Sequence, residues 1–257
     1  MSILLTNDDG IYAEGLGVLF GEMQELGECA IVAPETEQSA VGHAITIYRP
    51  LMVRKAGKGG RFLGYAVRGT PADCVKIGVK ELLPKPVELV VSGINVGANV
   101  GINVLYSGTV SAATEAAILG ISSIAVSLDT KSGGVDFSFA ARFTKKLAGL
   151  VMKHEFLRRV PLNVNVPTLP ENEIRGIVVT RQGNARLVEE FEQRLDPRGN
   201  IYYWLAGETL LPETDDIESD ACALRRGFVT VTPIQHDLTR HGAVDGVREA
   251  LADLVDS

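Results

Sequence analysis

Segments of strand character alternate with segments of helical periodicity through the first two thirds of the chain, and this alternation most restricts the folds open to it. Strand-like runs occupy residues 3–6, 29–33, 44–54, 61–68, 87–92, 121–128 and 162–166. Apolar residues at helical spacing predict helices over 15–26, 71–83, 108–119 and 136–154. Because strands that alternate with helices build a mostly parallel sheet covered on both faces, we predict an α/β fold.

The last third of the chain has a different pattern. Strands are predicted at 174–180 and 228–232, and a helix at 244–255. Between them, segments 187–191 and 200–205 flank the turn-rich Asp196-Pro197-Arg198-Gly199, which predicts a long hairpin with aromatic residues at 202–204. We predict one α/β domain over 1–257, with a β-rich arm at about 183–206. An isolated hairpin is barely stable in water, so the arm must pack on its own core or on a second subunit.

Composition excludes several classes of protein. The 257 residues carry 25 basic and 32 acidic side chains, and the net charge of −7 argues against stable nucleic-acid binding. Three scattered cysteines and four histidines favour neither a disulfide framework nor a histidine-rich zinc site. The sequence shows no signal-peptide pattern and no apolar run of about 18 residues that could span a membrane. We expect a cytoplasmic protein without membrane contact.

Two adjacent carboxylates follow the first predicted strand. In an open parallel sheet, ligands bind beyond the carboxyl ends of the strands, and Asp8, Asp9 and Gly10 stand at such an end. A triplet of this kind often forms a turn in which one aspartate caps a helix. Yet neighbouring carboxylates repel each other unless a cation neutralises them, and Gly10 permits the backbone turn that brings both to one ion. The triplet is therefore a candidate metal site as well as a candidate cap.

Further oxygen-bearing residues follow two other predicted strands. Ser39 comes after the second strand and Asn95 after the strand at 87–92. Taken singly, each is an ordinary loop or turn residue. Taken with the two aspartates, they form an all-oxygen set that suits Mg²⁺, Mn²⁺ or Ca²⁺ and disfavours zinc.

A glycine-rich loop and a helix start come next in the chain. Gly93, Gly97 and Gly101 are spaced by four, which matches neither the dinucleotide fingerprint nor a P-loop. The segment 107–111 then opens the predicted helix 108–119 with small and hydroxyl-bearing residues. Exposed N–H groups at a helix N-terminus bind anions, although small residues there also serve close packing. A phosphate site is one of the two interpretations.

Four motifs in this order resemble the signature blocks of the SurE family. They are L-T-N-D-D-G at 5–10, P-E-T-E-Q-S at 34–39, S-G-I-N-V-G at 92–97 and Y-S-G-T-V at 106–110. R-G-T-P-A-D-C-V at 68–75 and V-T-P at 231–233 also fit, so the resemblance covers most of the chain. It implies a three-layer, Rossmann-like core with a mostly parallel sheet. It also implies that the hairpin arm and the C-terminal segment are exchanged in homodimers or homotetramers.

The resemblance also implies roles for individual residues. One divalent cation per subunit, Mg²⁺ or Mn²⁺ with Ca²⁺ as a further candidate, would be held by Asp8, Asp9, Ser39 and Asn95. The positions that match phosphate-contacting residues are Asn99, Ser107, Gly108 and Thr109.

Two histidines and one aspartate complete the set of candidates. Asp237 and His241 are four residues apart, either as a surface pair or, as the family's D-L-T-x-H motif implies, close to the site. His241 would be the acid for the departing ribose oxygen and Asp237 would orient it. His43 lies just beyond Ser39 and is a candidate for lining the substrate cleft.

The expected activity is metal-dependent hydrolysis of nucleoside 5′-monophosphates to nucleoside and phosphate. Asp8 and Asp9 would hold the cation and orient the attacking water, and 3′-monophosphates and short polyphosphate are further candidate substrates. A haloacid-dehalogenase phosphatase is an alternative, but its nucleophile motif needs D-x-D, which Asn7-Asp8-Asp9-Gly10 does not supply. A nucleotide- or metal-sensing protein without turnover is the non-enzymatic alternative.

Overall fold

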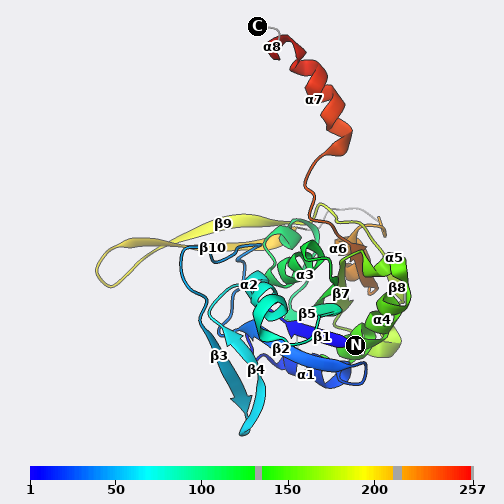
Figure 1. Ribbon diagram of the computed structural model, residues 1–257. Coiled ribbons are helices and arrows are strands. Elements are labelled where there is room, and N and C mark those ends of the chain that lie inside the picture. Colours follow the sequence, from blue (N-terminus) through cyan, green and yellow to red (C-terminus); the bar gives the residue numbers. More distant parts are fainter. Residues whose placement is uncertain (131–134, 211–215, 256–257) are drawn as a thin grey trace.

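A nine-stranded sheet forms the centre of the computed structural model, which describes residues 1–130, 135–210 and 216–255 (Figure 1). In spatial order its strands are β3 (Val53–Lys58), β4 (Arg61–Val67), β2 (Glu28–Pro34), β1 (Ser2–Thr6), β5 (Leu89–Val96), β6 (Ser122–Asp129), β7 (Leu162–Pro167), β11 (Val229–Pro233) and β8 (Ile177–Val179). Neighbours are parallel except for β3 with β4 and β11 with β7. The predicted mostly parallel α/β sheet is confirmed.

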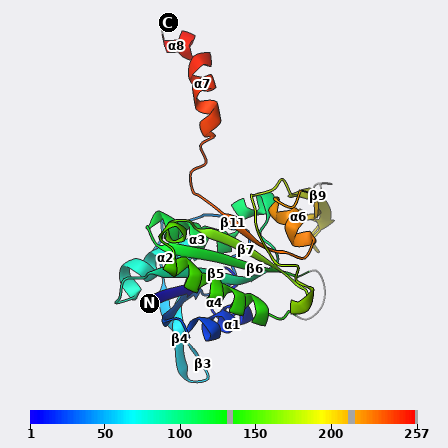
Figure 2. The same cartoon turned by 90° about the vertical axis from the view of Figure 1, so that its right-hand side faces the viewer.

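Helices cover both faces of the sheet, which gives three layers (Figure 2). α1 (Glu14–Met23) and α4 (Ser138–Lys153) pack on one face, and α2 (Pro71–Ile77) and α3 (Gly108–Ile118) pack on the other. Side chains of β1 alternate between the layers: Ile3 and Leu5 join the core under α1, and Leu4 joins the core under α2 and α3. The centre of the sheet is therefore buried on both sides.

Short helices complete the described part of the chain. They are the π-helical turn Gly78–Leu82, the 3₁₀ turns Gly101–Leu105, Glu171–Glu173 and His241–Ala243, and the α-helices α5 (Glu155–Arg158), α6 (Asp220–Arg225), α7 (Val244–Ala250) and α8 (Ala252–Val255). Among the described residues, we find no helix with the length and apolar character needed to cross a membrane.

Two segments leave the core (Figure 1). The predicted hairpin is confirmed as β9 (Arg186–Leu195) paired antiparallel with β10 (Ile201–Leu210) in a two-stranded sheet of its own. After β11 the chain runs outward and ends in α7 and α8. Both segments present apolar side chains to solvent, including Trp204 in the arm and Leu254 in α8.

Several sequence predictions of local structure need correction. The strand predicted at 44–54 begins only at Val53, because the backbone of residues 42–46 is bonded to Tyr106, Thr70 and Asp73 instead of to a neighbouring strand. The strand predicted at 174–180 is reduced to Ile177–Val179 at the edge of the sheet. The C-terminal helix is divided into α7 and α8, and the helix predicted at 71–83 turns π-helical after Ile77.

Candidate active site

The structure brings the aspartates that follow β1 and the residues around Ser39 and Asn95 together at the carboxyl ends of neighbouring strands. β1 lies between β2 and β5, with Thr6 in register with Ser92, so Asp8, Asp9 and Asn95 follow the paired residues by only two or three positions. The backbone N–H of Gln38 donates to the Asp8 carbonyl at 2.7 Å. This bond ties the segment that carries Ser39 directly to the end of β1.

Asp8 is buried against the start of α3. Its carboxylate accepts hydrogen bonds from both the hydroxyl and the backbone N–H of Thr109, the latter at 3.2 Å. A Cβ atom on Gly108 would lie 2.8 Å from the Asp8 Cβ, so only glycine allows this approach. The N-terminus of α3, predicted from the sequence as an anion site, therefore lies directly beside the first aspartate.

The two aspartates share an unfavourable electrostatic environment. Burial, together with the charges of Asp8 and Glu37, raises the pKa of Asp9 to about 6, while a hydrogen bond from the Val96 backbone acts in the opposite direction. Burial also raises the pKa of Asp8, against the hydrogen bonds from Thr109. Clustered carboxylates with raised pKa values are typical of sites that a cation neutralises.

Neutral oxygen atoms are available at the same edge. The Asn95 amide nitrogen donates to the Gly97 carbonyl at 2.7 Å, so its amide oxygen is the atom that could bind a cation. The Ser39 hydroxyl is exposed and donates to Glu37 at 2.5 Å. Within the described ranges, no three His, Cys, Asp or Glu side chains are grouped as a metal site. Two carboxylates and neutral oxygens are donors that would suit a hard cation such as Mg²⁺ better than zinc.

Asn99 lies in the loop after β5 and is held from two strands. Its backbone N–H donates to the Asn165 side chain at 2.7 Å, and its carbonyl accepts from Asn163 at 2.9 Å and Asn165 at 3.1 Å. Its own amide nitrogen donates to the Ser127 hydroxyl at 2.8 Å. The residue predicted to contact phosphate is thus buried and held through both its backbone and its side chain.

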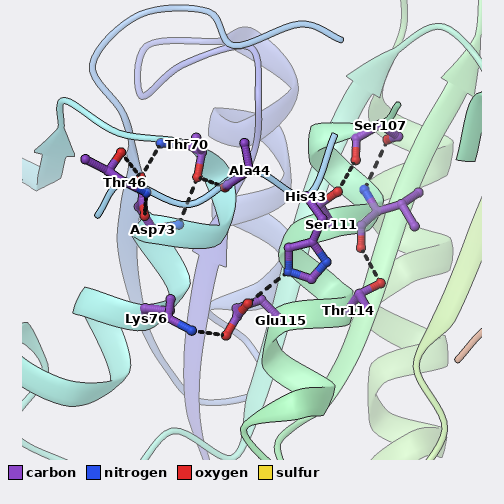
Figure 3. A network of polar contacts seen from close by, with 11 residues as sticks. His43, Ala44, Thr46, Thr70, Asp73, Lys76, Ser107, Ser111, Thr114 and Glu115 are labelled. Atoms are coloured by element: carbon purple, nitrogen blue, oxygen red, sulfur yellow. Dashed lines mark hydrogen bonds and ion pairs between the residues drawn. The ribbon is translucent and has the colours of Figure 1, made fainter. Parts of the chain in front are cut away.

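Ser107 is the N-cap of α3. Its hydroxyl accepts from the Val110 N–H at 3.1 Å, and its carbonyl accepts from the Ser111 hydroxyl at 2.6 Å (Figure 3). The side chain thus performs the capping role that serine favours at such a position. The structure places Ser107, Gly108 and Thr109 together beside Asp8, as a helix start that could receive an anion.

The His43 side chain points toward α3. Its Nε2 lies 2.9 Å from an oxygen of Glu115, whose other oxygen accepts from the Lys76 ammonium at 2.7 Å (Figure 3). His43 also lines an open groove of about 980 Å³ along α3, together with Val110, Ser111 and the segment 233–238. Asp8 and Asp9 are not among the residues that line this groove, and the imidazole is bound to a buried carboxylate, so a contact of His43 with substrate stays a prediction.

Asp237 and His241 form a pair outside the core. The imidazole Nε2 lies 2.7 Å from the Asp237 carboxylate, although the intervening residues are not helical. The His241 side chain is 70% exposed, and it opens the segment of α7 that runs away from the sheet (Figure 1). No hydrogen bond or ion pair joins Asp237 or His241 to Asp8 or Asp9 in the described part of the chain.

Sequence reasoning missed several residues that shape the site. Glu37 lies close enough to both aspartates to raise their pKa values, and Glu115 anchors His43. Asn163 and Asn165 hold the Asn99 loop. The alternating asparagines of L-N-V-N-V at 162–166 are the sequence signal that indicates Asn163 and Asn165, because buried amides on a central strand need hydrogen-bond partners.

Comparisons with known proteins all point to one family. The family model described as "Survival protein SurE" matches residues 3–189. A protein named 5′-nucleotidase SurE from Syntrophus aciditrophicus is 61% identical over 252 residues, which cover 98% of this chain and 94% of that protein. Another of the same name from Syntrophobacter fumaroxidans is 54% identical, over 95% of this chain and 97% of that one. The crystal structure of SurE from Aquifex aeolicus superimposes with a TM-score of 0.83 at 38% identity, covering 97% of this chain and 99% of that chain.

Proposed function

The chain belongs to the SurE family, and from this membership and the arrangement of its site we propose a metal-dependent phosphatase of nucleoside 5′-monophosphates. That it is a phosphoric monoester hydrolase, a 5′-nucleotidase, follows from relatives of this name that match nearly its full length. The dependence on a cation, the choice of cation and the roles of individual residues are what the site's geometry adds to this proposal.

The paired carboxylates of Asp8 and Asp9 support the cation most strongly. The buried carboxylate of Asp8 and the half-buried carboxylate of Asp9 lie near a third, Glu37, and the pKa of Asp9 is raised to about 6, so the site lacks positive charge. Asp8, Asp9, Ser39 and Asn95 would hold Mg²⁺ or Mn²⁺, with Ca²⁺ as a further candidate. When bound, such a cation neutralises phosphate charge and lowers the pKa of water.

The chain's own residues bind and orient the substrate. At the start of α3, the N–H groups of Thr109 and Val110 would exchange their present partners, Asp8 and the Ser107 hydroxyl, for phosphate oxygens, and the second hydrogen of the Asn99 amide would bind a further one. Asp8 and Asp9 would accept hydrogen bonds from the attacking water and so orient it. His241 would donate the proton to the departing ribose oxygen. It can do so only if the segment 234–255 packs against a core and brings the imidazole to the site.

A phosphate-release screen tests this function. Purified protein is incubated with each nucleoside 5′-monophosphate, the 3′-monophosphates and short polyphosphate, with Mg²⁺ or Mn²⁺ present. We expect release from 5′-monophosphates at least. Binding of nucleotide and metal, seen as thermal stabilisation without any phosphate release, would instead support a sensing protein. A trapped aspartyl-phosphate would support direct attack by an aspartate, as in the haloacid-dehalogenase class.

We propose further that the chain assembles into at least a homodimer through the arm and the C-terminal segment. The arm exposes large apolar side chains on both of its faces: Phe191, Leu195, Ile201, Tyr203 and Leu205 on one, and Tyr202 and Trp204 on the other. In the C-terminal segment the exposed apolar residues are Val244, Val247, Leu251 and Leu254, at the spacing of one helical stripe. Exposed aromatic and aliphatic rows of this kind are typical of subunit interfaces.

Removing the arm should therefore dissociate the assembly. Val188 and Glu208 pair directly across the hairpin, so residues 188–208 can be deleted and the ends joined by a short Gly-Ser turn. We expect a monomer by light scattering at micromolar concentration, where the intact chain is a dimer or larger. An intact chain that is already monomeric, or a deletion variant of unchanged size, would show that the arm does not hold the assembly.

A further inference from the structure

The segment that carries Ser39 has no regular secondary structure and little burial of its own. We call residues 39–46 the strap. The strap follows the segment beside the aspartates and precedes residues 47–52, which lead to β3. Every residue of the strap is exposed or only partly buried. Ala40 has a φ of 56°, a left-handed conformation that alanine disfavours. Such a backbone persists only where its surroundings determine it. The position of the strap must therefore come from its contacts with neighbouring elements.

Polar contacts hold the strap against two helices (Figure 3). The Thr46 N–H and hydroxyl donate to Asp73 at 2.9 and 2.7 Å, and the Ala44 carbonyl accepts from Thr70 at 2.7 Å, all at the N-terminus of α2. The Gly42 N–H donates to the Tyr106 carbonyl at 3.0 Å, immediately before Ser107. The strap thus links the Ser39 side of the site to its phosphate side.

Glu115 connects the strap to the middle of α3. Its side chain is only 4% exposed, and its two oxygens bond His43 of the strap at 2.9 Å and Lys76 of α2 at 2.7 Å. A buried carboxylate needs such partners, because an unpaired charge is costly away from water. The structure therefore joins α2, α3 and the strap at a single carboxylate.

We propose that Glu115 is a positioning residue for the cation site: through His43 it fixes the strap, and with it the Ser39 hydroxyl, relative to Asp8 and Asp9. This inference rests on the proposed cation site. Glu115 itself touches neither substrate nor cation, and Lys76 bonds the same carboxylate from α2 rather than from the strap. Loss of a residue that contacts a metal ligand directly commonly changes affinity about 10- to 100-fold, and because Glu115 acts one contact further away, through His43, we expect an effect at the lower end of that range.

A mutant cycle on the full chain tests the proposal by direct Mn²⁺ binding without substrate, measured from the electron paramagnetic resonance of free Mn²⁺. His43→Ala and Glu115→Leu, which leaves no acceptor for the imidazole, should each raise the dissociation constant about 10-fold. The double variant should bind no more weakly than either single one, because both remove the same contact. Lys76→Gln is the matched control, which removes the other partner of Glu115 and should leave the constant within about 2-fold.

A second readout needs no metal. Amide exchange of the Gly42 N–H, followed by nuclear magnetic resonance, should accelerate in His43→Ala and Glu115→Leu and stay unchanged in Lys76→Gln. Unchanged binding and exchange in both variants, additive losses in the double variant, or an equal loss in Lys76→Gln would overturn the positioning role. A wild-type chain that binds no Mn²⁺ would instead contradict the proposed cation site, and the exchange rates would still decide whether Glu115 holds the strap.

Discussion

Asp8→Asn is expected to lower kcat/KM for nucleoside 5′-monophosphates by about 10³-fold, which corresponds to about 4 kcal/mol of transition-state stabilisation. The substitution removes one negative charge from the proposed cation site and keeps the shape of the side chain. It also leaves an acceptor oxygen for Thr109, whose hydroxyl and N–H both donate to Asp8. The measurement is phosphate release at saturating Mg²⁺ or Mn²⁺, with the folded state checked by circular dichroism.

A control separates charge from hydrogen bonding. Thr109→Val removes the hydroxyl donor to Asp8 but keeps the carboxylate, so it should cost much less than Asp8→Asn. If Asp8 acted only as a partner of the α3 N-terminus, asparagine would replace it well and both variants would retain near wild-type rates. That result would contradict a direct role of the Asp8 charge.

Asp9→Asn should weaken cation binding about 100-fold while making the cation-free protein more stable. Burial and the charges of Asp8 and Glu37 raise the pKa of Asp9 from 3.8 to about 6, so its ionised form is unfavourable in the folded state. A shift of this size would amount to about 3 kcal/mol for a fully buried group, and for the half-buried Asp9 we expect about 1 kcal/mol. Chemical unfolding in excess chelator measures this gain.

The sign of the pH dependence follows from the same shift. Between about pH 4 and 6 the folded state holds a proton on Asp9 that the unfolded state has released, so wild-type stability falls as the pH rises through this window. The advantage of Asp9→Asn should therefore be complete above about pH 6 and vanish near pH 4. A variant that is destabilised at about pH 7.5, or an advantage independent of pH, would contradict the electrostatic account of the aspartate pair.

Much of the fold could be predicted because its signals are local. Short-range chemistry determines three of the elements. An apolar run forms β1, Thr70 and Pro71 begin α2, and the turn-rich segment 196–199 closes the hairpin of β9 and β10. The parallel order of strands then places Asp8, Asp9 and Asn95 at one edge, which is a consequence of topology alone.

The errors arise where distant residues decide local structure. Residues 44–52 carry strand-forming side chains, but the capping residues Thr70 and Asp73 take the backbone bonds at positions 44 and 46. Asn163 and Asn165 look like the solvent face of a strand and are instead fully buried under the Asn99 loop. Such pairings join residues 26 to 66 positions apart, and periodicity carries no information about them.

The position of His241 shows a different limit. Its four-residue spacing from Asp237 correctly suggested a contact, which the structure makes at 2.7 Å. Where that pair lies relative to the aspartates depends on how the segment after β11 packs, and this segment has apolar residues that its own core does not cover. A motif can therefore indicate a pair without indicating which surface the pair serves.

Removal and restoration of the cation tests the central claim most directly. The protein is treated with excess chelator, desalted, and assayed for phosphate release from nucleoside 5′-monophosphates before and after addition of Mg²⁺ or Mn²⁺. We predict that release stops in the chelated protein, returns with either cation, and does not return in Asp8→Asn. Full activity of the wild-type protein in the presence of chelator, or no release with any nucleotide and cation, would contradict the account.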